Sequence, residues 1–263
     1  MSSIVKGLYI VSTPIGNLDD ISLRAIKVLK ASDIILCEDT RHSYNMLKHF
    51  NISKKLISYH KFNEKKALTQ IIKHLKDGKT LSLISDAGTP TISDPGNILI
   101  NECIKEKISV IPIPGPSSIT SSMSISGFDQ KFLFYGFLPK KEGELNKILS
   151  SLTGLNFSMI FFIPSLKVNF YITAFKKYFK GRKIMLAREL TKKHETIYRD
   201  LVEEVKVFKL NLKGELTVVI SEKINKDIYI DLEKIKIMIK KYLLKYRVKD
   251  VVELISDREK MPK

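Results

Sequence analysis

Cysteine is scarce in this chain of 263 residues, which has only Cys37 and Cys103, in separate segments without a C-x-x-C partner. This scarcity argues against a disulfide framework and against a zinc site, and it fits a reducing compartment. We therefore expect a cytoplasmic protein without a metal ion. Long apolar runs are also missing, since the longest, MIFFI at 159–163, is far too short to span a bilayer. The N-terminal run GLYIVSTPIG is broken by Pro14 and Gly16, so we expect neither a signal peptide nor a membrane partner.

The common nucleotide-binding motifs are absent from the sequence. No G-x-G-x-x-G follows the first apolar run, and G-x-x-x-x-G-K-[ST] occurs nowhere in the chain. These absences disfavour NAD and ATP as ligands.

The charge of the chain is strongly positive and unevenly distributed. The net charge is +17, of which residues 1–120 contribute +5 and residues 121–263 contribute +12. A basic second half suggests a polyanionic partner such as RNA. The alternative is compositional, because Lys outnumbers Arg 38 to 7 and an AT-rich genome produces the same bias.

Short apolar runs alternate with segments of helical periodicity in the first half of the chain. We expect strands at residues 8–13, 33–39, 56–59, 80–85 and 109–114. Between them, apolar residues recur at three- and four-residue spacing and predict helices at residues 21–32, 64–78 and 97–107. Such alternation is typical of βα units around a mostly parallel sheet.

A second α/β series follows residues 126–131, which lack periodicity and are predicted to form a linker. Its strands are expected at residues 132–137, 157–165, 182–189, 195–200 and 215–222. The short turn LTKKH separates the third of these strands from the fourth, which predicts an antiparallel hairpin and a mixed sheet. Residues 228–256 then predict one or two Lys-rich helices. The chain is thus expected to be an α/β protein with domains at 1–125 and 126–225 and a helical tail at 226–263.

Four segments rich in polar residues, three of them with Gly and Pro, follow strands of the first half. They are STPIGNLDD (12–20), EDTRHS (38–43), SDAGTPTISDPG (85–96) and PGPSS (114–118). Ligands of parallel α/β proteins bind at the carboxyl ends of the strands, where Gly allows close approach and Pro fixes the turn. Each segment alone is compatible with turn chemistry only, but four of them at one sheet edge predict a binding site.

Five strings carry a resemblance to a known family. TPIGNLDDIS (13–22), CEDTRHS (37–43), SDAGTPTISDPG (85–96), PIPGPSS (112–118) and ARELTK (187–192) resemble the ribosomal RNA small subunit methyltransferase I family, within the tetrapyrrole methylase superfamily. The resemblance covers about residues 7–222. It implies a two-domain class III methyltransferase fold, S-adenosylmethionine as the cofactor between the domains, and a homodimer. The implied reaction is 2′-O-methylation of a cytidine ribose in 16S rRNA, in the decoding centre of the small ribosomal subunit.

The resemblance also implies where the cofactor binds. The 85–96 loop would wrap the methionine end of the cofactor, with Asp86 facing its cationic groups and Ser117 and Ser118 facing polar groups. The expected cofactor-binding residues are Pro14, Gly16, Asn17, Asp86, Ala87, Gly88, Thr89, Ile92, Ser93, Asp94, Gly115, Ser117 and Ser118.

One string departs from the family pattern. The RNA-acting branch usually has Glu-Ser-Pro-His-Arg where this chain keeps Pro164 but has Ile163, Ser165, Leu166 and Lys167 around it. No role of the missing Glu or His is therefore assigned to this chain.

Methylation of a ribose hydroxyl is accelerated by a group that takes up the hydroxyl proton. The candidate catalytic residues are Glu38, Asp39, Arg41, His42, Glu189 and Lys192. The carboxylates and the imidazole are candidates for the base, and the two cations are candidates for binding the flanking phosphates. The alternatives are a strand-end ion-pair cluster and solvated charges of a hairpin. Two other functions stay open: a methyltransferase that acts on a small molecule or a protein, and a non-catalytic RNA-binding relative.

Overall fold

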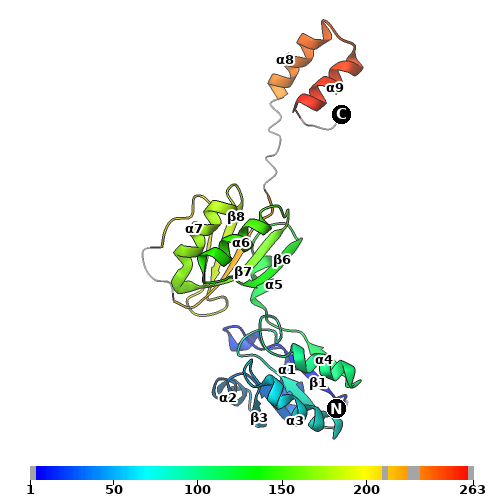
Figure 1. Cartoon of the computed structure of the whole chain (residues 1–263), viewed down its shortest axis with the longest axis vertical. Coiled ribbons are helices and arrows are strands. Elements are labelled where there is room, and N and C mark those ends of the chain that lie inside the picture. The colour runs from blue at the N-terminus through cyan, green and yellow to red at the C-terminus, as the bar shows by residue number, and fades with distance from the viewer. Residues whose placement is uncertain (1–3, 209–212, 224–231, 260–263) are drawn as a thin grey trace.

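The computed structural model of the chain describes residues 4–208, 213–223 and 232–259. These residues form two five-stranded sheets and, after them, a pair of helices (Figure 1). None of the described helices is long and apolar enough to cross a lipid bilayer.

The first sheet is wholly parallel. Its strands are β1 (Leu8–Val11), β2 (Ile34–Cys37), β3 (Lys55–Ser58), β4 (Leu81–Leu83) and β5 (Val110–Ile113). They lie in the order β3-β2-β4-β1-β5. Each strand falls within or overlaps a predicted run, and the predicted parallel arrangement is confirmed.

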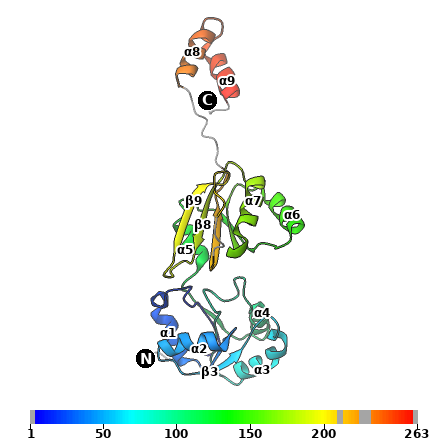
Figure 2. The ribbon, with the colours of Figure 1, turned by 90° about the vertical axis from the view of Figure 1, so that its left-hand side faces the viewer.

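Helices cover both faces of the first sheet (Figure 2). They are α1 (Leu23–Ala31), α2 (Thr40–His49), α3 (Glu64–Lys76) and α4 (Asn97–Lys105), with a short 3₁₀ turn η1 (Leu18–Asp20) before α1. Successive strand residues point to opposite faces. Tyr9 and Val11 therefore pack with α1 and α2, whereas Leu8 packs with α3 and α4.

Helix α2 corrects one expectation. Residues 38–43 were expected as a loop, but Thr40 begins a helix. The reason is the Asp39 side chain, whose Oδ1 accepts hydrogen bonds from the backbone N–H groups of Arg41 (2.8 Å) and His42 (3.4 Å). An Asp at this position satisfies N–H groups that the first helical turn leaves free.

The second sheet is mixed, as predicted. Its strands are β6 (Phe132–Phe137), β7 (Ser158–Pro164), β8 (Lys183–Arg188), β9 (Thr196–Leu201) and β10 (Glu215–Ile220). Their order is β6-β7-β10-β8-β9, in which β6 and β7 are parallel and every other pair is antiparallel. The predicted hairpin is the β8–β9 pair.

Two cores flank the second sheet. Helices α6 (Glu142–Leu152) and α7 (Val168–Tyr178), the latter preceded by the 3₁₀ turn η2 (Ser165–Lys167), pack on one face. Helix α5 (Ser118–Ser124) packs on the other face, where its Ile119 packs against the cluster that contains Val219 of β10. Ile15, from the loop after β1, is buried in this same cluster. The cluster therefore joins the two halves of the chain and sets how the two sheets meet.

Arg182, before β8, is the one charged side chain in the described part of the chain that is buried, with 3% of its surface exposed. Its guanidinium lies 5.4 Å from the ring centroid of Phe179. Its terminal nitrogens donate hydrogen bonds to four carbonyl oxygens, those of Thr153, Leu155, Phe157 and Ser221. The cation thus ties the end of α6 to β7 and β10.

The C-terminal part contains α8 (Leu232–Leu243) and α9 (Val248–Glu259), so two helices follow the sheets. They pack on each other through a small core of Ile235, Val251 and Ile255. Residues 228–231 of the predicted helical stretch lie outside the described residues. The division of the chain after residues 125 and 225 stays a prediction.

Candidate functional site

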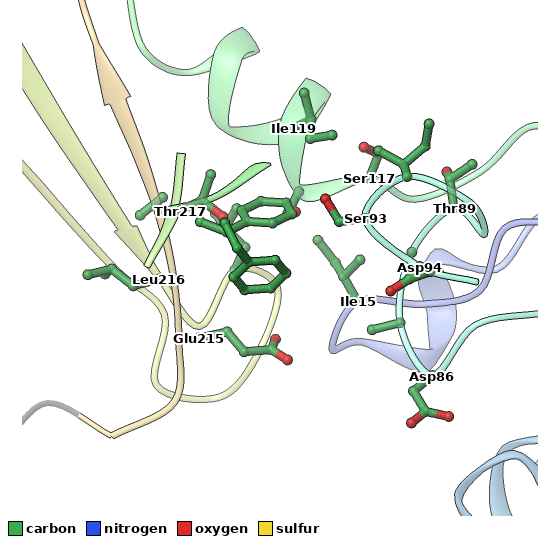
Figure 3. Close-up of a pocket in the computed structure, with 18 of the residues that line it drawn as sticks. Ile15, Asp86, Thr89, Ser93, Asp94, Ser117, Ile119, Glu215, Leu216 and Thr217 are labelled. Atoms are coloured by element: carbon green, nitrogen blue, oxygen red, sulfur yellow. The ribbon is translucent and has the colours of Figure 1, made fainter. Parts of the chain in front are cut away.

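A cavity of about 430 Å³ lies between the carboxyl-end loops of the first sheet and the facing edge of the second sheet (Figure 3). One wall comes from the loops after β1, β2 and β4 and from the start of α5. The other wall comes from the last residues of β6 and β7 and from the first residues of β10. Because β10 runs antiparallel to β7, the beginning of β10 lies at the same edge as the end of β7. The volume is in the range of small-molecule and cofactor sites, roughly 300–1,000 Å³.

Most of the predicted cofactor-binding residues line this cavity. Nine of them do: Asp86, Ala87, Gly88, Thr89, Ile92, Ser93, Asp94, Ser117 and Ser118. Pro14, Gly16, Asn17 and Gly115 do not line it. Of the six candidate catalytic residues, Glu38 alone lines the cavity. Roles for all of these residues stay predictions.

The 85–96 loop is fastened to the loop after β1. Thr13 and Gly88 exchange two backbone hydrogen bonds, of 2.9 and 3.0 Å between nitrogen and oxygen. The Thr13 hydroxyl donates to the Ser85 carbonyl at 3.0 Å, and the hydroxyls of Ser12 and Thr89 lie 2.9 Å apart. The first half of the loop is therefore fixed before any ligand arrives.

The second half of the loop is strained. Thr91 and Ser93 have φ angles of +71° and +70°, which are unfavourable for residues with a side chain. Each such residue costs on the order of 1–3 kcal/mol. Gly96, at φ +137°, permits the strain, because a Cβ there would lie 2.6 Å from Thr91 Cγ2 and 2.8 Å from Leu83 Cδ2. This arrangement accounts for the glycine at position 96.

Three carboxylates stand on the first-sheet wall, and we call Glu38, Asp86 and Asp94 the acidic cluster. Burial, with the charges of Glu38 and Asp86, raises the pKa of Asp94 to about 6. Burial and then the charge of Asp86 raise the pKa of Glu38. Within the described residues, none of the three forms a salt bridge. Since Glu38 and Asp94 resist ionisation there, a cationic ligand would stabilise their charged forms.

The described residues contain no group of three His, Cys, Asp or Glu side chains arranged to hold a metal ion.

Asp39, Arg41 and His42 lie behind or beside the cavity rather than in it. The backbone N–H of Asp39 donates to Asp86 Oδ1 at 3.2 Å, and His42 Nε2 lies 3.1 Å from the Asp86 carbonyl oxygen. Hydrogen bonds from the N–H groups of Arg41 and His42 lower the pKa of Asp39. The Arg41 side chain is 92% exposed, and its Nε lies 3.7 Å from Asp39 Oδ1. Helix α2 thus supports Asp86 and presents the exposed guanidinium of Arg41, paired with Asp39, at its start.

Glu189 and Lys192 belong to an ion pair with Glu215, and we call these three residues the ion-pair cluster. Lys192 Nζ lies 3.0 Å from Glu189 Oε1 and 3.0 Å from Glu215 Oε2. Glu189 Oε1 also accepts the backbone N–H of Glu215 at 2.9 Å. Burial alone would raise the pKa of Glu189, but these two donors outweigh it and the pKa is lowered. The cluster reaches the cavity only through Glu215, which lines it.

The loop after β1 touches the turn of the β8–β9 hairpin. The backbone N–H of Asn17 donates to the Thr191 hydroxyl at 3.0 Å. A Cβ on Gly16 would clash with Lys192 Cγ and would lie 2.9 Å from the Leu190 carbonyl oxygen. Only glycine fits this contact, so Gly16 and Asn17 hold the two halves together at the rim of the cavity. Gly115 has a similar packing role, because its Cβ would lie 3.0 Å from Ser12 Cβ.

The second-sheet wall was not predicted as part of the site. Its lining residues are Phe137, Phe162, Ile163, Pro164, Ala187, Leu190, Gly214, Glu215, Leu216 and Thr217. Two signals were available: Ile163 and Pro164 belong to the string that departs from the family pattern, and Ala187 opens ARELTK. Phe137 ends one predicted strand and Phe162 lies inside another, and no polar motif marks either of them.

Comparison with known proteins identifies relatives along most of the chain. The family model for tetrapyrrole (corrin/porphyrin) methylases matches residues 7–206. Ribosomal RNA small subunit methyltransferase I of Mesomycoplasma conjunctivae is 44% identical over 225 residues, which are 85% of this chain and 94% of that one. The Thermotoga maritima protein of the same name is 42% identical over 219 residues, 82% of this chain and 98% of that one. The Rickettsia prowazekii protein is 42% identical over 260 residues, 97% of this chain and 92% of that one.

Solved structures share the fold at low identity. Diphthine synthase superposes with a TM-score of 0.64 at 14% identity, over 81% of this chain and 89% of that one. Uroporphyrin-III C-methyltransferase of Thermus thermophilus, in complex with S-adenosylhomocysteine, gives 0.59 at 14% identity, over 82% and 97%. The methyltransferase CobJ gives 0.62 at 15%, over 82% and 94%. These structures share the fold, and the family model with the relatives above establishes that the chain belongs to the ribosomal RNA small subunit methyltransferase I family, within the tetrapyrrole (corrin/porphyrin) methylases.

Proposed function

We propose that this protein transfers a methyl group from S-adenosylmethionine to the 2′-hydroxyl of a cytidine ribose in 16S rRNA. The observation that carries the proposal is the match with relatives named ribosomal RNA small subunit methyltransferase I, which spans almost the full length of several of them. S-adenosylmethionine is the cofactor, in agreement with the methyltransferase family and with the S-adenosylhomocysteine complex of a structure of the same fold.

The residues around the cavity suit this cofactor. It carries an ammonium and a sulfonium group, which the acidic cluster would attract, and a carboxylate, for which Ser117 and Ser118 offer hydrogen bonds. The wall that contains Phe137 and Phe162 offers apolar surface for the uncharged parts. When bound, the cofactor supplies the activated methyl group.

The protein's own residues would then position the hydroxyl and take up its proton. Glu38 is our candidate for the base, because it lines the cavity and its raised pKa makes it a better proton acceptor than an ordinary carboxylate. A general base contributes roughly 10²–10⁴-fold. Holding the reactants in line contributes about 7–11 kcal/mol in favourable cases. The ion-pair cluster would hold Gly214 and Glu215 in the wall, and Arg41 would bind a flanking phosphate.

The assembly is proposed to be a homodimer that acts on the small ribosomal subunit in the cytoplasm. Strand β6 is an edge strand with exposed aromatic side chains, Phe132 at 42% and Tyr135 at 38%. Such a surface supports a partner copy. Light scattering at micromolar concentration would contradict a dimer if it gave the mass of one chain.

The test of the function is methyl transfer to its natural substrate. The protein is incubated with radiolabelled S-adenosylmethionine and small subunits from a strain that lacks the enzyme, and the label is mapped on the RNA. We expect the label on one cytidine, and resistance of the following phosphodiester bond to alkali, because 2′-O-methylation blocks that cleavage. Glu38→Gln, which keeps the shape of the side chain but cannot take up a proton, should bind S-adenosylhomocysteine and transfer at least about 100-fold more slowly. Label on ribosomal protein would favour a protein methyltransferase, and cofactor binding without transfer would favour a non-catalytic RNA-binding protein.

A further inference from the structure

The turn after β3 carries Phe62, whose side chain is 94% exposed. The next most exposed described phenylalanine, Phe137, is 63% exposed and lies in the cavity wall. Phenylalanine is usually buried because removing its apolar ring from water lowers the free energy of the protein. A single exposed apolar side chain needs no explanation by itself, so the inference depends on how and where this ring is held.

Three hydrogen bonds hold the turn in one conformation. The backbone N–H of His60 donates to Asn63 Oδ1 at 2.8 Å, and the Asn63 amide donates to the Ser58 carbonyl at 2.9 Å. The backbone N–H of Phe62 donates to His60 Nδ1 at 3.2 Å. The ring is therefore presented to solvent from a fixed backbone, and little conformational entropy would be lost if a ligand covered it.

The turn lies beside the proposed catalytic edge. Strand β3 pairs with β2, and the Tyr59 N–H donates to the Cys37 carbonyl at 2.8 Å, one residue before Glu38. The imidazole of His60 is close enough to Glu38 to oppose the rise in the pKa of that carboxyl. Phe62 thus follows, three residues after Tyr59, the strand contact that stands next to Glu38 in the sequence.

Exposed cations lie near Phe62 in the sequence and on the neighbouring helix. Lys61, Lys65 and Lys66 are exposed in the same segment, and Arg41 is exposed at the start of the neighbouring helix. Glu64 is the one acidic residue between 60 and 66. An aromatic ring next to such cations is the combination with which proteins bind single-stranded RNA, because bases stack on the ring and phosphates pair with the charges.

We propose that Phe62 is a stacking platform for an unpaired RNA base that neighbours the methylated nucleotide, with Arg41 and Lys61 at the adjoining phosphates. The inference rests on the proposed function, since it assigns a role in binding the RNA of that reaction. A stacking platform at Phe62 would favour single-stranded over duplex RNA, because paired bases do not expose their faces to a side chain.

The absence of tryptophan from the chain gives a direct test. In Phe62→Trp the new residue is the only tryptophan, and its fluorescence should be quenched by a ten-residue oligocytidylate but not by an RNA duplex of the same length. The matched control is Ile104→Trp, at a residue that is 62% exposed. Ile104 is seven residues after Asn97, where α4 begins next to the 85–96 loop. It therefore lies about 10 Å along the helix axis from that loop. Equal quenching in both variants, or none in Phe62→Trp, would overturn the proposal.

Affinity measurements separate stacking from simple burial of apolar surface. Phe62→Leu should bind the oligocytidylate about 5- to 100-fold more weakly than the wild type, whereas Phe62→Tyr should bind it about as well. S-adenosylhomocysteine affinity should be the same in all three proteins. Equal RNA affinity of Phe62→Leu and the wild type would overturn the platform and leave the proposed function standing. Failure of the wild type to label RNA would instead contradict the proposed function, whatever Phe62→Trp shows. A concentration-dependent blue shift of Phe62→Trp without RNA would show that a second copy of the chain covers the ring, and would also overturn the proposal.

Discussion

The acidic cluster and the ion-pair cluster lie on opposite sides of the cavity and differ in how their carboxylates are paired. In the acidic cluster, carboxylates lie close together without a salt bridge among the described residues, and the pKa of Asp94 rises to about 6. In the ion-pair cluster, Lys192 lies between two carboxylates, and the pKa of Glu189 is lowered. Both clusters shift pKa values, but the shifts differ in sign.

The direction of the pKa shift separates carboxylates that are suited to bind a cationic ligand from carboxylates whose ion pairs stabilise the fold. A raised carboxylate pKa means that the ionised form is destabilised in the empty protein, so a cation is favoured there. A lowered pKa means that the ionised form already has its partners. Perturbed pKa values mark functional sites and structural ion pairs alike, and here their direction distinguishes the two.

The largest expected effect concerns Arg182, the buried cation of the second sheet. Arg182→Ala should lower the free energy of unfolding by roughly 3–5 kcal/mol, because four carbonyl oxygens around a buried side chain lose their donor. Urea denaturation measures this change. Arg188→Ala is the control, since Arg188 donates to one exposed carbonyl, that of Lys213, and its loss should cost less than about 1 kcal/mol. Equal stability of the two variants would contradict a structural role for Arg182.

The next effect concerns the acidic cluster. Asp94→Asn should lower the affinity for S-adenosylmethionine about tenfold and that for S-adenosylhomocysteine less than about threefold, because only the former carries a sulfonium charge. The same change should slightly raise the stability of the empty protein, because it removes a carboxylate that burial and its neighbours disfavour. Calorimetric titration measures both affinities. Asp20→Asn, at an exposed residue outside the cavity, is the control. An equal loss for both ligands would show that Asp94 shapes the loop rather than attracts the cation.

The smallest effect is expected in the ion-pair cluster. Lys192→Met should lower the free energy of unfolding by about 1 kcal/mol, because the Lys192 side chain is partly exposed and its ion pairs are partly screened. The affinity for S-adenosylmethionine should change less than about threefold, since Lys192 does not line the cavity. A loss of affinity of about tenfold or more would contradict the claim that the ion-pair cluster is structural and does not bind the cofactor.

The sequence predicted the first-sheet wall better than the second. Apolar runs followed by Gly, Pro and Asp mark the ends of β1, β4 and β5, and Gly88 and Gly96 do adopt positive φ angles there. Helix α7 was not predicted. Its sequence VNFYITAFKKY is rich in aromatic and β-branched residues of low helix propensity, and the helix forms because Tyr171 and Phe175 pack into the core.

The second-sheet wall depends on how the two sheets pack against each other. No local pattern in the amino-acid sequence predicts that packing. Phe137 and Leu216 lie 51 and 130 residues after Asp86 in the sequence, yet all three line the same cavity. The buried residues Ile15 and Val219, with the partly buried Ile119, bring the sheets together, and each of them is an ordinary apolar residue in its own segment. Gly16 is similar: its presence was noticed, but its contact with the hairpin turn is visible only in three dimensions.

The most direct test of the account is the pH dependence of ligand binding to the wild type. The pKa of Asp94 lies above its usual 3.8, so the folded protein binds the proton more tightly than the unfolded chain, and the empty protein should lose stability as the pH rises from about 4 to about 6. A sulfonium favours the ionised carboxylate. The affinity for S-adenosylmethionine should therefore rise with pH through the pKa of Asp94 and level off above about 7.

Calorimetry between pH 5 and pH 8 with both ligands makes the measurement, and the ratio of the two dissociation constants isolates the sulfonium, because the ligands share the same amino-acid end. We predict that S-adenosylmethionine gains about tenfold over S-adenosylhomocysteine between pH 5 and pH 7 and nothing further above it. A ratio that stays constant over this range would contradict the claim that the acidic cluster holds the cationic centre of the cofactor.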